Sequence, residues 1–191
     1  MVREKTRQIN HMARRSPTPH NLLAPMTQAV EQETWDATRP RWHPNLMRLY
    51  EYWRSIHPAG GGLPGRQHLD PMEIPHLLPS IWMLDVQREP FRLRYRLVGT
   101  RIEEVRGHKL TGSWLDDSSP EIVNFESYYR RYRDVVETGQ PRWRRGRSQM
   151  QHLRDIDELE NILLPLAADG KNVDLLLCKT IYYDRFGRTL L

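Results

Sequence analysis

The sequence has few of the residues that build disulfide frameworks, thiolate sites or membrane spans. Only one of its 191 residues is cysteine, which excludes an internal disulfide and a metal site made of several thiolates. No apolar run approaches the ~20 residues that cross a bilayer, and the N-terminal segment MVREKTRQINHMARRS lacks the apolar stretch of a secretion signal. We therefore expect a cytoplasmic protein without a membrane span.

Apolar residues are also scarce, and lysine is nearly absent. Hydrophobic residues make up 38% of the chain and the mean hydropathy is -0.73, so part of the chain is expected to lie outside the core. The formal charge of +5 comes mainly from arginine, with 25 arginines against 4 lysines. An arginine excess reflects genomic base composition as readily as anion binding, so charge alone gives little support for a nucleic-acid partner.

Motifs that mark catalytic or metal sites are missing. The sequence contains no GxSxG, HExxH, P-loop or GxGxxG motif, and its 8 histidines do not have the spacing of metal ligands. His68 and Asp70 are close in sequence, but they lie in a loop rich in glycine and proline where solvated polar residues are common. We therefore expect neither an enzyme nor a metal site.

Two domains of different character are predicted. Residues 1–41 mix basic residues and prolines without a sustained apolar period, so they are expected to form a flexible basic arm, with at best a short helix over residues 26–35. Residues 42–191 are long enough to form one domain with its own hydrophobic core.

A predicted hairpin is the centre of this domain. Apolar residues alternate from Ile81 to Val86 and again from Leu93 to Leu97, and the short segment between them, Gln87 to Pro90, favours a tight connection. The second strand has one apolar face and one arginine face. The first is apolar on both faces, which is typical of a strand inside a sheet.

Helices and further strands follow from the same patterns. An amphipathic helix over Leu46–Ile56 is expected to cover the outer face of the sheet, and the longest helix is predicted over Ile122–Val136. The spacing of Thr100 and Glu103 is that of a capping box, which predicts a short helix ending at Gly107. Three more strands are predicted over residues 142–151, 157–166 and 173–183. The fold class is therefore α+β.

The segment LLPSIWMLDVQREPFRLRYRLVGTRIEEVRGHKLTGSWLDD resembles a bacterial PAS-like family with the form LLPxIWLLDVxRxPxRFRYRLVGTxIxxxxGxxLTGxxLD. The resemblance extends from about Leu49 to Tyr183. It implies a five-stranded antiparallel sheet with helices on one face, whereas the N-terminal helix and the disordered arm follow from the residue pattern. The order of elements comes from the periodicity, and the family name comes from the resemblance.

A PAS-like fold implies a ligand cavity between the sheet and its helices. Arg101, which follows the VGT motif, is a candidate cation for an anionic ligand. The other candidate side chains are aromatic, aliphatic or small polar groups on the strands and helices around that cavity: Tyr95, Leu97, Trp114, Leu115, Phe125, Tyr129, Leu164, Cys178 and Thr180. The alternative, that these residues form an ordinary core, stays open.

The resemblance also disfavours two cofactors. The flavin-binding photoreceptor branch of the family requires a reactive cysteine in a helical motif, and no cysteine lies between Thr100 and Pro120. The haem-binding branch takes a histidine from the long helix, and Glu121 to Glu137 contains none. No cofactor is therefore identified.

Three hypotheses about function remain. The first is a stand-alone PAS-like regulatory module that has no output domain of its own, binds a small ligand or a protein partner, and forms a homodimer. The second is a nucleic-acid-associated protein that uses the basic arm and the segment PRWRRGR. The third, with the weakest support, is an enzyme that acts on a small acidic substrate through Arg101 and Asp116.

Overall fold

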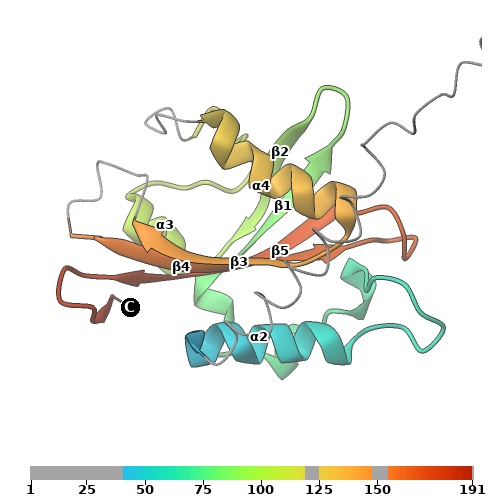
Figure 1. The fold of residues 1–191 in the computed structure, drawn as a ribbon, viewed down its shortest axis with the longest axis horizontal. Helices are drawn as coiled ribbons and strands as arrows, with labels where there is room; N and C mark the ends of the chain where they lie inside the picture. Colours follow the sequence, from blue (N-terminus) through green and yellow to red (C-terminus); the bar gives the residue numbers. More distant parts are fainter. Residues whose placement is uncertain (1–40, 119–124, 148–154, 191) are drawn as a thin grey trace, which may run out of the picture. The chain divides into compact units, whose positions relative to one another are not determined.

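A computed structural model describes residues 41–118, 125–147 and 155–190. Within these residues six strands form one antiparallel sheet with the order β2-β1-β5-β4-β3, and β6 pairs with β5 (Figure 1). The strands are β1 (Ile81–Gln87), β2 (Arg92–Val98), β3 (Arg142–Arg147), β4 (Glu158–Leu166), β5 (Leu175–Tyr183) and β6 (Thr189–Leu190). The predicted α+β fold is confirmed. The sequence did not predict β6, because a strand of two residues has no measurable period.

Helices cover both faces of this sheet (Figure 1). α3 (Thr100–Arg106) and α4 (Phe125–Thr138) lie on one face, and α2 (Pro44–Ser55) lies on the other. α2 is the predicted N-terminal helix. Trp53 on this helix donates a hydrogen bond of 2.9 Å from its indole Nε1 to the Pro165 carbonyl of β4. Short 3-10 turns over Arg66–His68, Pro71–Glu73 and Leu78–Ser80 connect α2 to β1.

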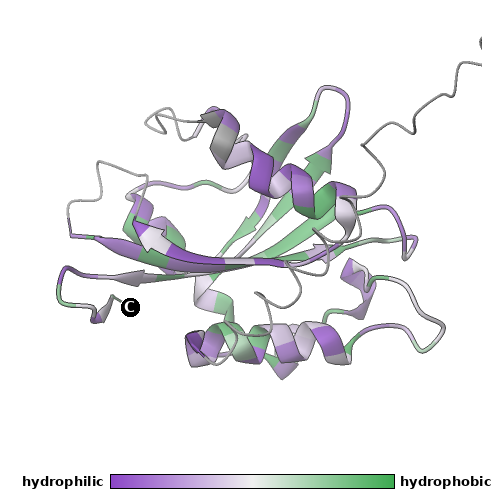
Figure 2. Cartoon of the chain, viewed as in Figure 1, coloured by the Kyte–Doolittle hydropathy of each residue, from purple (hydrophilic) through white to green (hydrophobic). Residues whose placement is uncertain are grey.

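The central strands are buried on both faces because helices cover both. Every residue of β5 is buried, and so is every residue of β4 after Glu158. Figure 2 shows hydrophobic residues along the central strands and hydrophilic residues along much of α4. The core between the sheet and α3 and α4 includes Trp82, Tyr132 and Leu176. None of the helices in the described residues has the length and apolar character needed to cross a bilayer.

A bulge in β2 changes the direction of Leu97. Leu84 pairs with Tyr95, but the preceding residue, Met83, pairs with Leu97, so Arg96 is an extra residue in β2. An extra residue reverses the alternation of side chains beyond it. Leu97 therefore does not share the buried face of Tyr95, and 45% of its surface is exposed. The prediction of an unbroken apolar face on this strand was wrong.

The capping box predicted at Thr100 is also absent. α3 begins at Thr100 itself with Gly99 as its N-cap, and Glu103 accepts a hydrogen bond of 3.3 Å from the Leu110 backbone instead of reaching back. A Cβ atom on residue 99 would overlap the Pro79 carbonyl oxygen, so only glycine fits there. Gly107 ends the helix with a left-handed φ of 74°, as predicted.

Three predicted segments lie partly or wholly outside the described residues. The first is the arm over residues 1–41 with its short helix, of which only residue 41 is described. The other two are the start of the long helix at Ile122 and the end of the third strand after Arg147.

Candidate functional site

A small cavity lies between the sheet and the helices α3 and α4. Its volume is about 40 Å³, which is room for about three waters if each needs 10–15 Å³. This is far below the roughly 300–1,000 Å³ of pockets that hold drug-sized ligands. Its apolar lining consists of Trp82, Ile102, Leu110 and Leu159. Its polar lining consists of Tyr95, Tyr128 and Tyr182, with Arg106, Arg144, Asn161 and Thr180.

The strand alternation explains which residues reach the cavity. Side chains on a strand point to opposite faces at every second position. Asn161 on β4 pairs with Thr180 on β5, and both line the cavity together with Tyr182, two residues further along β5. Their neighbours Glu160, Lys179 and Ile181 alternate with them and are buried too.

Three hydrogen bonds hold the polar lining in place. Arg131 on α4 donates from Nη2 to Asn161 Oδ1 at 2.5 Å. Trp82 donates from Nε1 to Thr180 Oγ1 at 3.1 Å. The third bond joins two residues of α4 one turn apart, and runs from the Tyr132 hydroxyl to the Tyr128 hydroxyl at 2.8 Å. Asn161, Thr180 and Tyr128 are therefore preorganised rather than free to rotate.

Two arginines extend into the lining. Arg106 on α3 is only 7% exposed and donates from Nη2 to the Ser118 carbonyl at 2.6 Å. Arg144 on β3 is half-buried and donates from Nη2 to the Arg147 carbonyl at 2.9 Å. A third arginine, Arg131, lies behind Asn161, and burial lowers its pKa. The cavity is thus surrounded by guanidinium groups from three different elements.

The lining tyrosines are neutral near physiological pH. Burial raises the pKa of Tyr95, Tyr128 and Tyr182 above that of an ordinary tyrosine. Each of these hydroxyls therefore keeps its proton and can act as a hydrogen-bond donor.

The structure brings only some of the candidate residues to the cavity. Tyr95 and Thr180 line it. Leu115, Tyr129 and Cys178 belong to the core packed around it, where burial raises the pKa of the Cys178 thiol.

Other candidates lie elsewhere. Leu97 is exposed because of the bulge. Leu164 pairs with Leu177 on the opposite face of the sheet, since Leu163 occupies the cavity side. Arg101 is exposed on α3, and the cation that lines the cavity from this helix is Arg106. The side chain of Phe125 lies outside the described part of the structure.

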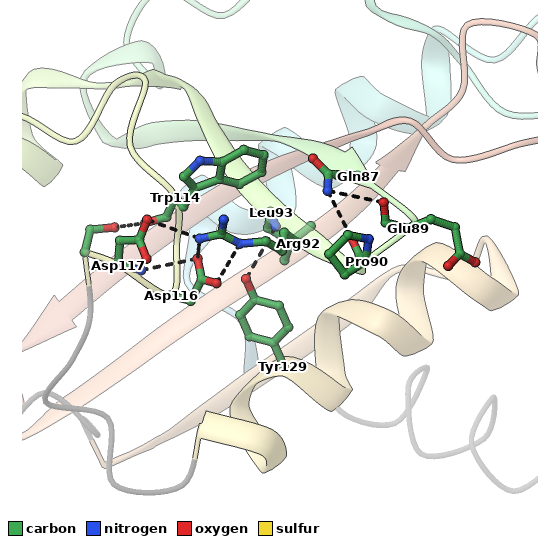
Figure 3. Close-up of polar contacts among 10 residues, drawn as sticks. Gln87, Glu89, Pro90, Arg92, Leu93, Trp114, Asp116, Asp117 and Tyr129 are labelled. Carbon is green, nitrogen blue, oxygen red and sulfur yellow. Dashed lines mark hydrogen bonds and ion pairs between the residues drawn. The ribbon is translucent and has the colours of Figure 1, made fainter.

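Trp114 belongs to a second polar cluster, on β2 and the turn after α3. Figure 3 shows the Arg92 guanidinium between the indole of Trp114 and two carboxylates. Arg92 contacts Asp116 through two hydrogen bonds of 2.8 Å and Asp117 through one of 3.1 Å, and its Cζ lies 4.4 Å from the indole centroid. The hydroxyl of Tyr129 accepts a bond from the Leu93 backbone at 3.4 Å. These contacts attach the turn and α4 to β2.

This second cluster bears on the enzyme hypothesis. Arg92 lowers the pKa of Asp116 by hydrogen bonding, so the carboxylate is ionised and engaged. Among the described residues, Arg101 is not one of the partners of Asp116. Within the described residues, no group of three or more His, Cys, Asp or Glu side chains is arranged to hold a metal ion.

The other face of the sheet holds two buried charged side chains beneath α2. Glu160 is fully buried and accepts hydrogen bonds from the His43 backbone at 2.8 Å, Trp143 Nε1 at 2.8 Å and the Tyr183 hydroxyl at 2.6 Å. Lys179 donates from Nζ to the Leu77 carbonyl at 3.2 Å and to the Ser80 hydroxyl. Burial lowers its pKa to about 8.

The sequence reasoning missed Arg106, Arg144, Asn161 and Glu160. One signal for the last two was present: β4 carries polar residues at positions 158, 160 and 161, directly before an apolar run. Polar residues inside a buried strand are expected to have specific partners. Nothing local distinguishes Arg106 or Arg144 from the other arginines.

Comparisons with known proteins bear on the chain as a whole. A sequence model of a family described as a PAS domain matches residues 41–179, which is most of the chain and includes all lining residues except Thr180 and Tyr182. The search among curated proteins found no match.

Proposed function

Because the chain belongs to the PAS domain family, a family of sensory and regulatory modules, we propose that it binds a small molecule in the cavity and transmits the bound state to a protein partner. The cavity lies between the sheet and the helices α3 and α4, and its polar lining is held by hydrogen bonds. A preorganised set of polar groups in an otherwise apolar cavity is typical of a binding site.

The observation that carries the proposal is the position of two consecutive residues on β4. Asn161 faces the cavity, and Glu160 faces α2, where it binds the backbone N-H of His43. His43 is the N-cap of α2. A ligand that shifts Asn161 therefore acts on the strand that also holds the start of α2.

The mechanism is a shift between two populations. A ligand that contacts Asn161 more favourably in one position of β4 stabilises the arrangement of α2 that goes with it, and the size of the shift is limited by the difference in affinity. A protein partner then reads the position of α2. A second copy of this chain is one such partner, and sedimentation at micromolar concentration distinguishes a dimer from a monomer.

Native mass spectrometry of the full chain, in a buffer supplemented with the low-molecular-weight extract of the cells that produce it, tests the binding step. We expect a bound small molecule that is absent in Leu159→Phe, because the larger ring occupies the cavity. Leu97→Phe is the matched control, since it makes the same change on an exposed side chain. A chain without any bound small molecule, or an equal loss in both variants, contradicts the proposal.

Hydrogen exchange tests the transmission step. The chain is compared in the presence of the cell extract and after the extract is removed by dialysis. We expect the amides at the start of α2 to exchange at different rates in the two forms. Unchanged exchange in α2, with changed exchange around the cavity, would mean that binding is not transmitted through β4.

A further inference from the structure

The polar groups of the cavity are all able to donate hydrogen bonds, and the described lining contains no carboxylate. Arginines can only donate, whereas amides and hydroxyls are usually able to accept as well. For Asn161 and Thr180, hydrogen bonds to neighbouring side chains decide which role the group takes.

Asn161 is oriented as a donor. Arg131 donates to its Oδ1 at 2.5 Å, so the amide oxygen is turned toward α4 and is engaged by a cation. The NH2 group of this amide makes no hydrogen bond to any described residue. Since Asn161 lines the cavity, this amine is the polar group that it offers to a ligand.

The hydroxyls around Asn161 are also able to donate hydrogen bonds. Thr180 Oγ1 accepts from the indole of Trp82, which leaves its own proton available. The hydroxyls of Tyr95 and Tyr182 make no hydrogen bond to any described residue, and burial keeps both protonated. Each of these three groups can therefore donate to a ligand in the cavity.

Positive charge accompanies these donors. Arg144 lines the cavity and Arg131 lies behind Asn161, and neither forms an ion pair with a carboxylate among the described residues. Burial lowers the pKa of Arg131, and the charge of the nearby Arg144 lowers it further. A buried arginine without a counter-ion is costly, and an anion in the cavity would offset that cost.

We propose that the cavity binds a small oxyanion, either a short carboxylate or an inorganic anion, through Arg144, the Asn161 amine and the hydroxyls of Thr180 and Tyr182. The inference rests on the proposed function, because it names the chemical class of the molecule that the regulatory module binds. A volume of about 40 Å³ limits that molecule to a few non-hydrogen atoms. A ligand of that size is expected to bind with a Kd no tighter than roughly tens of micromolar.

The test is an NMR titration of the full chain with acetate and with acetamide, at constant ionic strength maintained with chloride. Acetate and acetamide have the same shape, and only acetate is an anion with two acceptor oxygens. We expect saturable chemical-shift changes at Asn161 and Thr180 with acetate. Acetamide should bind at least roughly tenfold more weakly. A parallel titration with phosphate distinguishes a carboxylate site from a phosphate site.

Two variants identify the groups responsible. Asn161→Asp keeps the oxygen that binds Arg131 and replaces the donor NH2 group with a second, negatively charged oxygen. We therefore expect the affinity for acetate to fall at least about tenfold while the variant stays folded. Arg144→Gln is expected to weaken acetate binding by a similar factor. Arg147→Gln is its control, because it removes the same charge from an exposed position on the same strand.

The outcomes separate this inference from the proposed function. If acetamide binds as tightly as acetate, or if Asn161→Asp binds acetate as well as the natural chain, the oxyanion site is refuted while a small-molecule cavity stands. If no anion and no neutral compound binds, and native mass spectrometry finds no bound molecule, both proposals fail.

Discussion

Replacing Glu160 tests whether its three hydrogen bonds fix α2 to the sheet. The carboxylate is fully buried, and its donors come from the segment before α2, from β3 and from β5. Glu160→Ala removes the shared acceptor and leaves three donors without it. The backbone of His43 and the indole of Trp143 are half-buried, whereas Tyr183 is only 6% exposed.

The magnitude follows from these exposures. An orphaned buried polar group costs about 1–3 kcal/mol. Water partly replaces the acceptor for His43 and Trp143, so each is assigned the low end of that range, and Tyr183 is assigned the high end. Allowing for the lost packing of the side chain and for the relief of a buried charge, we expect Glu160→Ala to cost roughly 3–5 kcal/mol. Glu160→Gln keeps one oxygen for two of the donors, and we expect a cost of about 1–2 kcal/mol.

Urea unfolding followed by tryptophan fluorescence measures these differences. Glu158→Ala is the control on the same strand, since Glu158 makes a half-exposed ion pair with Arg145 at 3.2 Å. Exposed pairs of this kind contribute about 0–1 kcal/mol. Hydrogen exchange should also rise at the start of α2 in Glu160→Ala. If Glu160→Ala and Glu158→Ala lose the same stability, the assigned role of Glu160 is wrong.

Three further predictions concern a buried charge, the bulge and the start of α3. The pKa of Lys179 is lowered to about 8 from 10.5, so the unfolded chain binds more protons between these values, and stability should rise with pH from about 8 to 10.5. The rise amounts to roughly 3 kcal/mol in the free energy of unfolding, and Lys179→Met should lose it. Unfolding of the natural chain and of the variant, measured across this pH range, checks this. Leu93→Ala should lower the free energy of unfolding by about 2–5 kcal/mol and Leu97→Ala by under about 1 kcal/mol, because only Leu93 is buried. Equal losses in urea unfolding would argue against the bulge. Gly99→Ala should lower the free energy of unfolding by several times the roughly 1 kcal/mol expected for Gly107→Ala. The reason is that a Cβ at residue 99 meets backbone oxygens, whereas one at residue 107 meets open space. Thermal unfolding that ranks the two variants in the reverse order would contradict this.

Periodicity predicted most of the elements in order. The hairpin, the helix over residues 46–56, the long helix and the last two strands were predicted within a few residues of their bounds in the structure. These elements have apolar residues at regular intervals, and that signal is local. The errors occurred where a single residue interrupts the pattern, as Arg96 does in β2, or where a tertiary contact overrides a local motif, as Gly99 does at the start of α3.

The candidate site was harder to predict, because its residues share no local pattern. Tyr95 and Thr180 could be selected as inward-facing polar residues on predicted strands, and both line the cavity. Arg101 and Arg106 are equally plausible from sequence, since each is an arginine on one short helix. Their exposure differs because α3 packs on the sheet with the side of Arg106 facing inward.

The amino-acid sequence alone determined the family, the α+β class and the order of the elements, since each depends on residue types at fixed spacing along the chain. Tertiary structure decided the strand order, which places β5 beside β1 and β4 beside β5. It also decided that Arg131 on α4 donates a hydrogen bond to Asn161 on β4, a residue that lines the cavity. The character of the cavity depends on that contact between distant segments, and no spacing along the chain records it.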